Sequence, residues 1–116
     1  MTDATIYHNP RCSKSRQTLE LLRQQDVEPR VVLYLETPPD RAELTALLEK
    51  LGIGPRPLLR RSEAVYKALG LDEPSLSDDA LIDAMVENPI LIERPIVVVG
   101  ERAVVARPPE RVLELL

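Results

Sequence analysis

The sequence predicts an α/β protein in which a mixed four-stranded sheet carries helices on its faces. Three observations support this prediction: a strand–helix–strand pattern near the N-terminus, a run of helices in the middle, and two strands joined by a short turn near the C-terminus. The length of 116 residues is enough for one domain with a hydrophobic core. The hydrophobic fraction of 44% argues against a disordered chain, and Leu, Ile and Val must form the core because Phe and Trp are absent.

The first strand is predicted over Ala4–Tyr7, where the residues are apolar or β-branched. A helix is predicted from about Ser13 to Gln25, and the following residues 26–29 end it with a proline. Residues 30–35 are rich in β-branched and apolar side chains and predict a second strand. A strand–helix–strand pattern of this length indicates a right-handed unit with parallel strands.

Residues 40–88 predict a compact helical insertion between the second and third strands. Asp40 and Glu43 have the spacing of a capping box at the start of its first helix. The leucines that follow recur on one helix face, and Gly52 then ends the helix: Leu44, Leu47, Leu48 and Leu51. Further helices are expected near residues 63–69 and from Ser77 to the Asn88-Pro89 pair. The segment contains no linker or repeat, so we predict a single domain over residues 1–116.

The C-terminal part predicts a hairpin and a last helix. Ile96–Val99 is a buried strand by composition, and Gly100-Glu101 suits a two-residue turn into an antiparallel partner over residues 102–106. A last helix is expected after Pro108-Pro109, with Val112, Leu115 and Leu116 available for packing. This order of elements is that of a thioredoxin-like fold.

Composition excludes several classes of function. The net charge of −4, without a basic run, argues against a nucleic-acid-binding protein. No apolar run approaches the roughly 20 residues of a membrane span, and the N-terminus lacks a signal pattern. One cysteine and one histidine cannot complete a tetrahedral metal site. The single cysteine fits a reducing compartment, so we expect a cytoplasmic protein without a bound metal.

The segment between the first strand and the first helix holds the only cysteine and the only histidine of the chain. Cys12 is predicted at the helix entrance, where unpaired backbone N–H groups and the helix dipole favour a thiolate. Lys14 and Arg16 add positive charge beside it. A buried structural cysteine is the ordinary alternative, but the polar loop around Cys12 disfavours it. Cys12 is therefore the candidate nucleophile.

The motif that begins at Cys12 is Cys-x-x-Ser, and the chain has no second thiol. A mixed disulfide at Cys12 would therefore need a resolving thiol from another molecule. The Ser15 hydroxyl could donate a hydrogen bond to the sulfur or to a bound oxyanion, or Ser15 could simply belong to the first helical turn. His8 is interpreted as a supporting residue that sets the electrostatics of the loop, with an ordinary loop histidine as the alternative.

Three arginines stand at the ends of predicted elements: Arg60, Arg94 and Arg107. Taken singly, each is typical of a surface arginine. Together they suit a tetrahedral oxyanion, because a guanidinium binds oxyanions with paired N–H donors.

The chain resembles the glutaredoxin-coupled arsenate reductases, the ArsC family, over nearly its whole length. The matching segments are Ile6-Tyr7-His8-Asn9-Pro10-x-Cys12, Ser15-Arg16, Leu33-Tyr34-Leu35-Glu36, Leu58-Leu59-Arg60, Asn88-Pro89-Ile90-Leu91-Ile92, Arg94-Pro95-Ile96-Val97-Val98 and Arg107-Pro108. The chain stops at Leu116, so it resembles the shorter, often chromosomal members. As a separate departure, it has Ser13 where active members often have glycine.

The resemblance implies an enzyme of arsenic detoxification that reduces arsenate to arsenite. Cys12 would be its catalytic cysteine, and His8 would help to lower the thiol pKa. The oxyanion-binding arginines would be Arg60, Arg94 and Arg107, to which we add Arg16, and a cis peptide bond is expected at Pro95. Glutathione would be a co-substrate and glutaredoxin a partner, with no bound cofactor.

Three other classes of protein are alternatives to an arsenate reductase of this family. Phosphatase-like arsenate reductases need Cys-x5-Arg, which Thr18 excludes. Spx-like transcriptional regulators share the fold but commonly carry a Cys-x-x-Cys switch, which Ser15 breaks. A glutathione-dependent thiol reductase without arsenate activity stays open, because the same thiolate and arginines could bind glutathione carboxylates.

Overall fold

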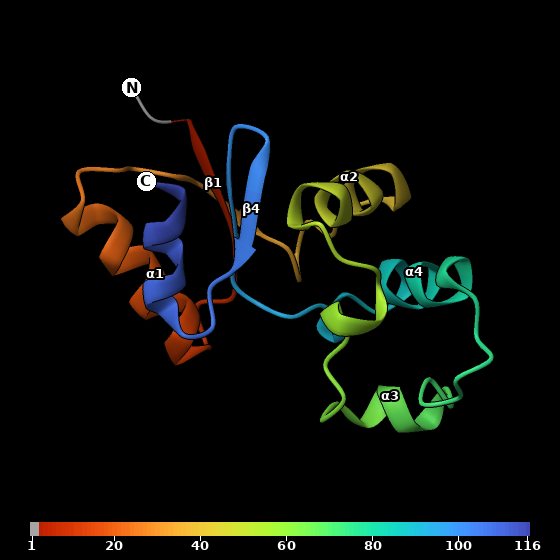
Figure 1. Ribbon diagram of the computed structural model, residues 1–116. Helices are drawn as coiled ribbons and strands as arrows, with labels where there is room; N and C mark the ends of the chain where they lie inside the picture. The colour runs from red at the N-terminus through yellow and green to blue at the C-terminus, as the bar shows by residue number, and fades with distance from the viewer. Residues whose placement is uncertain (1–2) are drawn as a thin grey trace. The chain divides into compact units, whose positions relative to one another are not determined.

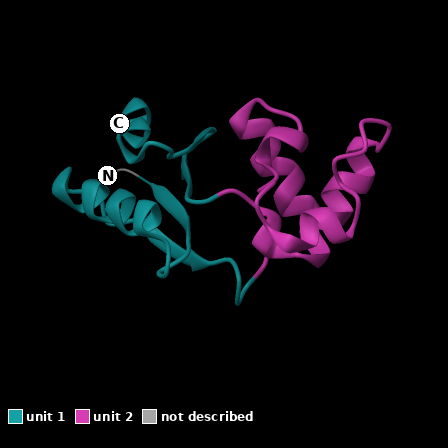
Figure 2. Ribbon diagram, turned by 90° about the horizontal axis from the view of Figure 1, so that it is seen from below, with its two compact units in different colours: residues 1–37, 94–116 teal, residues 38–93 magenta. Residues whose placement is uncertain are grey.

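The computed structural model (Figure 1) describes residues 3–116. Its contacts divide the chain into two compact units, shown in different colours in Figure 2. Unit 1 comprises Met1–Thr37 and Arg94–Leu116, and unit 2 comprises Pro38–Glu93. Unit 1 holds the sheet, and unit 2 is built from helices, α-helical and 3-10, with no strand of that sheet.

The sheet of unit 1 has four strands in the order β2-β1-β3-β4. The strands are β1 (Ala4–His8), β2 (Arg30–Leu33), β3 (Ile96–Val99) and β4 (Arg102–Val105). β1 pairs with β2 in parallel, whereas β1–β3 and β3–β4 are antiparallel. The predicted mixed four-stranded sheet, with its helical insertion after the second strand, is therefore confirmed. The predicted two-residue turn is also present, because Val99 and Arg102 are paired across Gly100-Glu101.

Helix α1 (Ser13–Gln24) connects the parallel strands and packs against η3 (Pro109–Leu115), a 3-10 helix at the C-terminus. Both helices contribute to a core of aliphatic side chains beneath the sheet: Ala4, Ile6, Leu22, Val27, Val97, Val104, Ala106, Val112 and Leu115. The predicted last helix is present. Leu116, which was expected to pack, is instead 47% exposed, because η3 ends at Leu115.

Two predicted strands are shorter in the structure than in the sequence reading. β2 ends at Leu33 because the N–H groups of Glu36 and Thr37 both donate to the carbonyl oxygen of Leu33 and form a turn. The apolar residues after Leu33 therefore belong to the turn. β4 ends at Val105, where the chain turns before the second of two prolines with cis peptide bonds.

Unit 2 contains α2 (Arg41–Leu51), η1 (Arg56–Leu58), α3 (Ala64–Ala68), α4 (Asp78–Glu87) and η2 (Pro89–Leu91). The predicted helix start at Asp40 is confirmed, because its Oδ1 accepts a hydrogen bond from the N–H of Glu43 at 2.8 Å. Gly52 ends α2 in the left-handed conformation with φ 69°, which glycine adopts without strain. The leucines of α2 that face inward are buried: Leu44, Leu47 and Leu48. Residues 3–116 include no helix with the length and apolar character of a membrane span.

Candidate active site

The loop after β1 is held by backbone and side-chain hydrogen bonds. The N–H of Cys12 donates to the carbonyl oxygen of Asn9 at 3.0 Å, and the N–H of Arg11 donates to Oδ1 of the same asparagine at 3.0 Å. Nη1 of Arg16 donates to the carbonyl oxygen of Pro10 at 2.8 Å. These bonds fix the turn so that Cys12 enters α1 in one defined conformation.

Cys12 is the N-cap residue of α1, with extended backbone angles and a partly exposed side chain. Burial raises the pKa of its thiol, but three groups lower it by more: the backbone N–H of Ser15, the Arg94 guanidinium and the backbone N–H of Lys14. The pKa of Cys12 is therefore below that of a free thiol. The N–H groups face the sulfur without conventional capping hydrogen bonds. No acidic residue lies in the first turn of α1 to oppose this effect.

Ser15 and His8 form a buried pair behind the loop. Oγ of Ser15 lies 2.6 Å from Nδ1 of His8 and accepts a hydrogen bond from the N–H of Asn9 at 3.1 Å. Of the alternatives for the Ser15 hydroxyl, a hydrogen bond to the Cys12 sulfur is absent from the contacts of the described residues, because the hydroxyl faces His8. A hydrogen bond to a bound oxyanion stays a prediction. The contact of Ser15 with the sulfur comes from its backbone N–H.

His8 is almost fully buried at the end of β1. Burial lowers its pKa, and the positive charges of Arg16 and Arg23 lower it further. A neutral imidazole is therefore favoured at neutral pH, and its Nδ1 can accept the hydroxyl proton of Ser15. The contribution of His8 to the loop is thus its hydrogen bond to Ser15 rather than a positive charge beside the thiol.

Arg94 and Arg107 lie together in unit 1. The Arg94 guanidinium lies close enough to the Cys12 thiol to lower its pKa. Nη1 of Arg107 donates to the carbonyl oxygen of Arg94 at 3.1 Å. Each arginine precedes a proline with a cis peptide bond; the bond at Pro95 was expected, and the one at Pro108 was not.

Arg60 and Arg16 are the other two arginines assigned to the oxyanion. Arg60 belongs to unit 2, where it forms ion pairs with Glu63 at 3.2 Å and Glu93 at 3.4 Å. The side chain of Arg16 supports the loop through its hydrogen bond to the Pro10 carbonyl. Binding of an oxyanion by either arginine remains a prediction.

Sequence reasoning did not single out Asn9, Glu63 or Glu93. The Asn-Pro pair at residues 9–10 is a turn signal from which the role of Asn9 could have been inferred. Glu93 pairs with an arginine 33 positions earlier in the chain, and no local pattern indicates such a contact.

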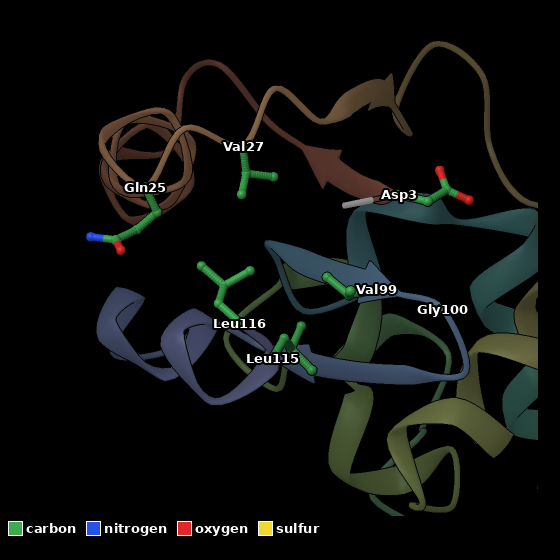
Figure 3. Close-up of a pocket in the computed structure, with 7 residues that line it drawn as sticks. All are labelled: Asp3, Gln25, Val27, Val99, Gly100, Leu115 and Leu116. Atoms are coloured by element: carbon green, nitrogen blue, oxygen red, sulfur yellow. The ribbon is translucent and has the colours of Figure 1, made fainter. Parts of the chain in front are cut away.

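Other features of the described residues add no catalytic group. No cluster of three or more His, Cys, Asp or Glu side chains within residues 3–116 could hold a metal ion. The hollow in Figure 3 is lined by Asp3, Gln25, Val27, Val99, Gly100, Leu115 and Leu116. These residues lie before β1, after α1, at the end of β3 and the turn that follows it, and at the end of η3, whereas Cys12 lies after the end of β1.

The sequence and the fold both match known proteins. The model of the ArsC family matches residues 7–115. The chain is 60% identical over 112 residues to the uncharacterized protein YfgD of Escherichia coli (strain K12), covering 96% of this chain and 94% of that protein. It is 52% identical over 116 residues to an Escherichia coli protein named arsenate reductase, covering all of this chain and 82% of that protein.

A solved structure of the arsenate reductase from Vibrio cholerae superposes with a TM-score of 0.97 at 52% identity, covering 99% of this chain and 98% of that one. A solved structure titled putative arsenate reductase from Yersinia pestis superposes with a TM-score of 0.92 at 57% identity, covering 97% of this chain and 99% of that one. The fold, the cysteine loop and these matches agree, and the chain belongs to the ArsC family.

Proposed function

We propose that this protein is an arsenate reductase that uses Cys12 as its nucleophile and takes electrons from glutathione and glutaredoxin. The observation that supports this most directly is the environment of the Cys12 sulfur, which faces two backbone N–H groups and the Arg94 guanidinium. These groups stabilise a thiolate, and the same kind of group binds an oxyanion. The identity of about 50% to proteins named arsenate reductase supports the choice of substrate.

The oxyanion is bound by arginines in this proposal. Two observations support assigning Arg94 and Arg107 to the oxyanion: Arg94 lowers the pKa of the Cys12 thiol, and Arg107 donates a hydrogen bond to the carbonyl oxygen of Arg94. Arg60 is added from its place in the family motif, and Arg16 from its place in the first turn of α1. Planar guanidinium groups suit a tetrahedral oxyanion because each can donate two parallel hydrogen bonds.

The first step forms the bond between sulfur and arsenic. The Cys12 thiolate attacks As(V), and one arsenate oxygen leaves as water after receiving two protons. Glutathione then attacks the same arsenic through its thiolate, and a second oxygen leaves as water. Arsenic is still As(V) at this point, bonded to both sulfurs.

The second part of the reaction transfers two electrons. A glutaredoxin thiolate attacks the glutathione sulfur and forms a mixed disulfide, and the electron pair of the broken sulfur–arsenic bond stays on arsenic as As(III). Water then hydrolyses the remaining bond, which releases arsenite and restores the Cys12 thiolate. External thiols are needed because Cys12 is the only cysteine of the sequence. This need for reduced thiols fits a reaction in the cytoplasm.

The test is a coupled assay with purified protein, arsenate, glutathione, glutaredoxin, glutathione reductase and NADPH. We expect arsenite to form in proportion to NADPH consumed, and Cys12→Ser to abolish both. Arg94→Ala should reduce kcat/KM strongly, whereas Arg111→Ala, a matched change at an exposed arginine of η3, should leave it unchanged. If no arsenite forms from arsenate, but NADPH oxidation with a glutathione mixed disulfide depends on this protein when glutaredoxin is left out, the protein is a thiol reductase instead.

A further inference from the structure

Arg60 lies between two carboxylates of unit 2. Its Nε is 3.2 Å from Oε1 of Glu63, and its Nη1 is 3.4 Å from Oε1 of Glu93. The exposed fractions of the three side chains are 15%, 22% and 23%, so water screens these ion pairs only in part. The Arg60 guanidinium therefore contacts two carboxylates. For an arginine assigned to bind an anion, this environment opposes the assigned role.

Backbone hydrogen bonds hold both glutamates next to Arg60. The N–H of Arg60 donates to the carbonyl oxygen of Leu91 at 2.7 Å, and the N–H of Glu93 donates to that of Leu58 at 2.9 Å. The two segments form an isolated antiparallel bridge between these bonds. On the other side, the N–H of Glu63 donates to the Arg60 carbonyl at 3.3 Å. Both leucines are fully buried, so the ion pairs follow from the packed backbone of unit 2.

The glutamates leave one nitrogen of Arg60 without a hydrogen bond. Nε and Nη1 are engaged, whereas Nη2 makes no hydrogen bond to any residue of the described part of the chain. A bidentate contact with an oxyanion uses Nη2 together with either Nε or Nη1. A glutamate already engages each of those two nitrogens. An oxyanion that binds Arg60 in this way therefore meets the negative charge of at least one glutamate.

We propose that Glu63 and Glu93 compete with the oxyanion for the Arg60 guanidinium and thereby limit the affinity of the protein for arsenate. The inference rests on the proposed function, in which Arg60 binds the oxyanion. Neither glutamate contacts the reacting arsenic in this account, so both are positioning residues. Their effect falls on KM and on the dissociation constant of arsenate rather than on kcat.

The test replaces each glutamate by glutamine, which keeps the size and the acceptor oxygen but removes the charge. We expect Glu63→Gln and Glu93→Gln each to lower the KM for arsenate about three- to tenfold, because a partly buried charge next to the guanidinium is removed. Calorimetry with arsenate in a Cys12→Ser background should show the same change in Kd without chemistry. Thermal unfolding checks that each variant is folded.

Two controls separate competition from a general effect. Asp79→Asn removes the same charge from another ion pair of unit 2, with Arg41, and should leave KM unchanged. In an Arg60→Ala background, the glutamine substitutions should give no gain in affinity, because competition requires the guanidinium. A gain that persists without Arg60 overturns the inference.

The outcomes distinguish this inference from the proposed function. If the wild type produces arsenite but both glutamine variants keep or raise its KM, competition is wrong and the proposed function stands. If no arsenite forms, the proposed function fails, and the calorimetric comparison still decides the inference: tighter arsenate binding by the glutamine variants supports it. Absence of arsenate binding in the wild type and in both glutamine variants overturns both the proposed function and the inference.

Discussion

Replacing Ser15 by alanine tests the buried network behind Cys12. The side chain of Ser15 is fully buried, and its Oγ is hydrogen-bonded to both Nδ1 of His8 and the N–H of Asn9. Both partners are themselves buried, with exposed fractions of 6% and 8%. Alanine removes the oxygen and leaves two buried polar groups without this partner.

The size of the effect follows from those two groups. A buried polar group that loses its partner costs about 1–3 kcal/mol. The higher helix propensity of alanine offsets about 0.5 kcal/mol or less in α1. We therefore expect Ser15→Ala to lower the free energy of unfolding by about 1.5–5.5 kcal/mol. Ser13 lies in the same helical turn but is exposed, so Ser13→Ala should change the free energy of unfolding by about 0.5 kcal/mol or less.

Urea unfolding followed by circular dichroism measures both variants under the same conditions. The pH is held at 7.5, where His8 stays neutral in the folded and the unfolded chain. Equal stability of the Ser13 and Ser15 variants would refute the reasoning, because it would mean that the Ser15 hydroxyl satisfies no buried group. A large loss in both would point to the helix turn itself rather than to the hydrogen bonds.

Three further predictions concern pH, reactivity and capping. The pKa of His8 is lowered by burial and by neighbouring arginines, so the unfolded chain binds the proton more readily. The free energy of unfolding should therefore fall as the pH drops below about 6.5, and a His8→Gln variant with an unchanged pH dependence would contradict this. The rate of Cys12 alkylation by iodoacetamide should rise with pH with a midpoint below the pKa of a free thiol, and Arg94→Ala should move this midpoint to higher pH. An unchanged midpoint would mean that Arg94 does not lower the pKa of Cys12. Asp40→Ala removes the acceptor for the N–H of Glu43 and should lower the free energy of unfolding by about 1 kcal/mol in the same urea assay. Asp40→Asn keeps an acceptor oxygen and should retain most of the stability of the wild type.

Local signals in the sequence predicted most of the fold correctly. The helix start at Asp40 and the end of α2 at Gly52 depend on side-chain and backbone geometry within a few residues, so their patterns are visible in the sequence. The strand–helix–strand pattern predicted one parallel pair of strands, and the Gly100-Glu101 turn predicted an antiparallel pair. Together they predicted the mixed sheet. The predicted end of β2 was wrong. Tyr34 and Leu35 have the composition of a strand, but they belong to a turn that is closed by hydrogen bonds to the Leu33 carbonyl oxygen.

The site was predicted less completely. The sequence indicated the activated cysteine, since a helix entrance and nearby positive charge are local features of Cys12. It did not indicate that the Ser15 hydroxyl faces His8, because the direction of a side chain at the strand–helix junction depends on how α1 packs on the sheet. It also gave no sign that His8 is held neutral, which results from burial.

The sequence by itself determined the order of the elements, the position of Cys12 at a helix entrance and the presence of a single cysteine, because each depends on composition or on neighbours in the chain. Only the tertiary structure decided which charges meet. Arg94 lowers the pKa of the Cys12 thiol from a position 82 residues later in the chain, and Glu93 forms an ion pair with Arg60 across 33 positions. Electrostatic effects depend on distance in space and on burial, and neither can be read from distance along the chain.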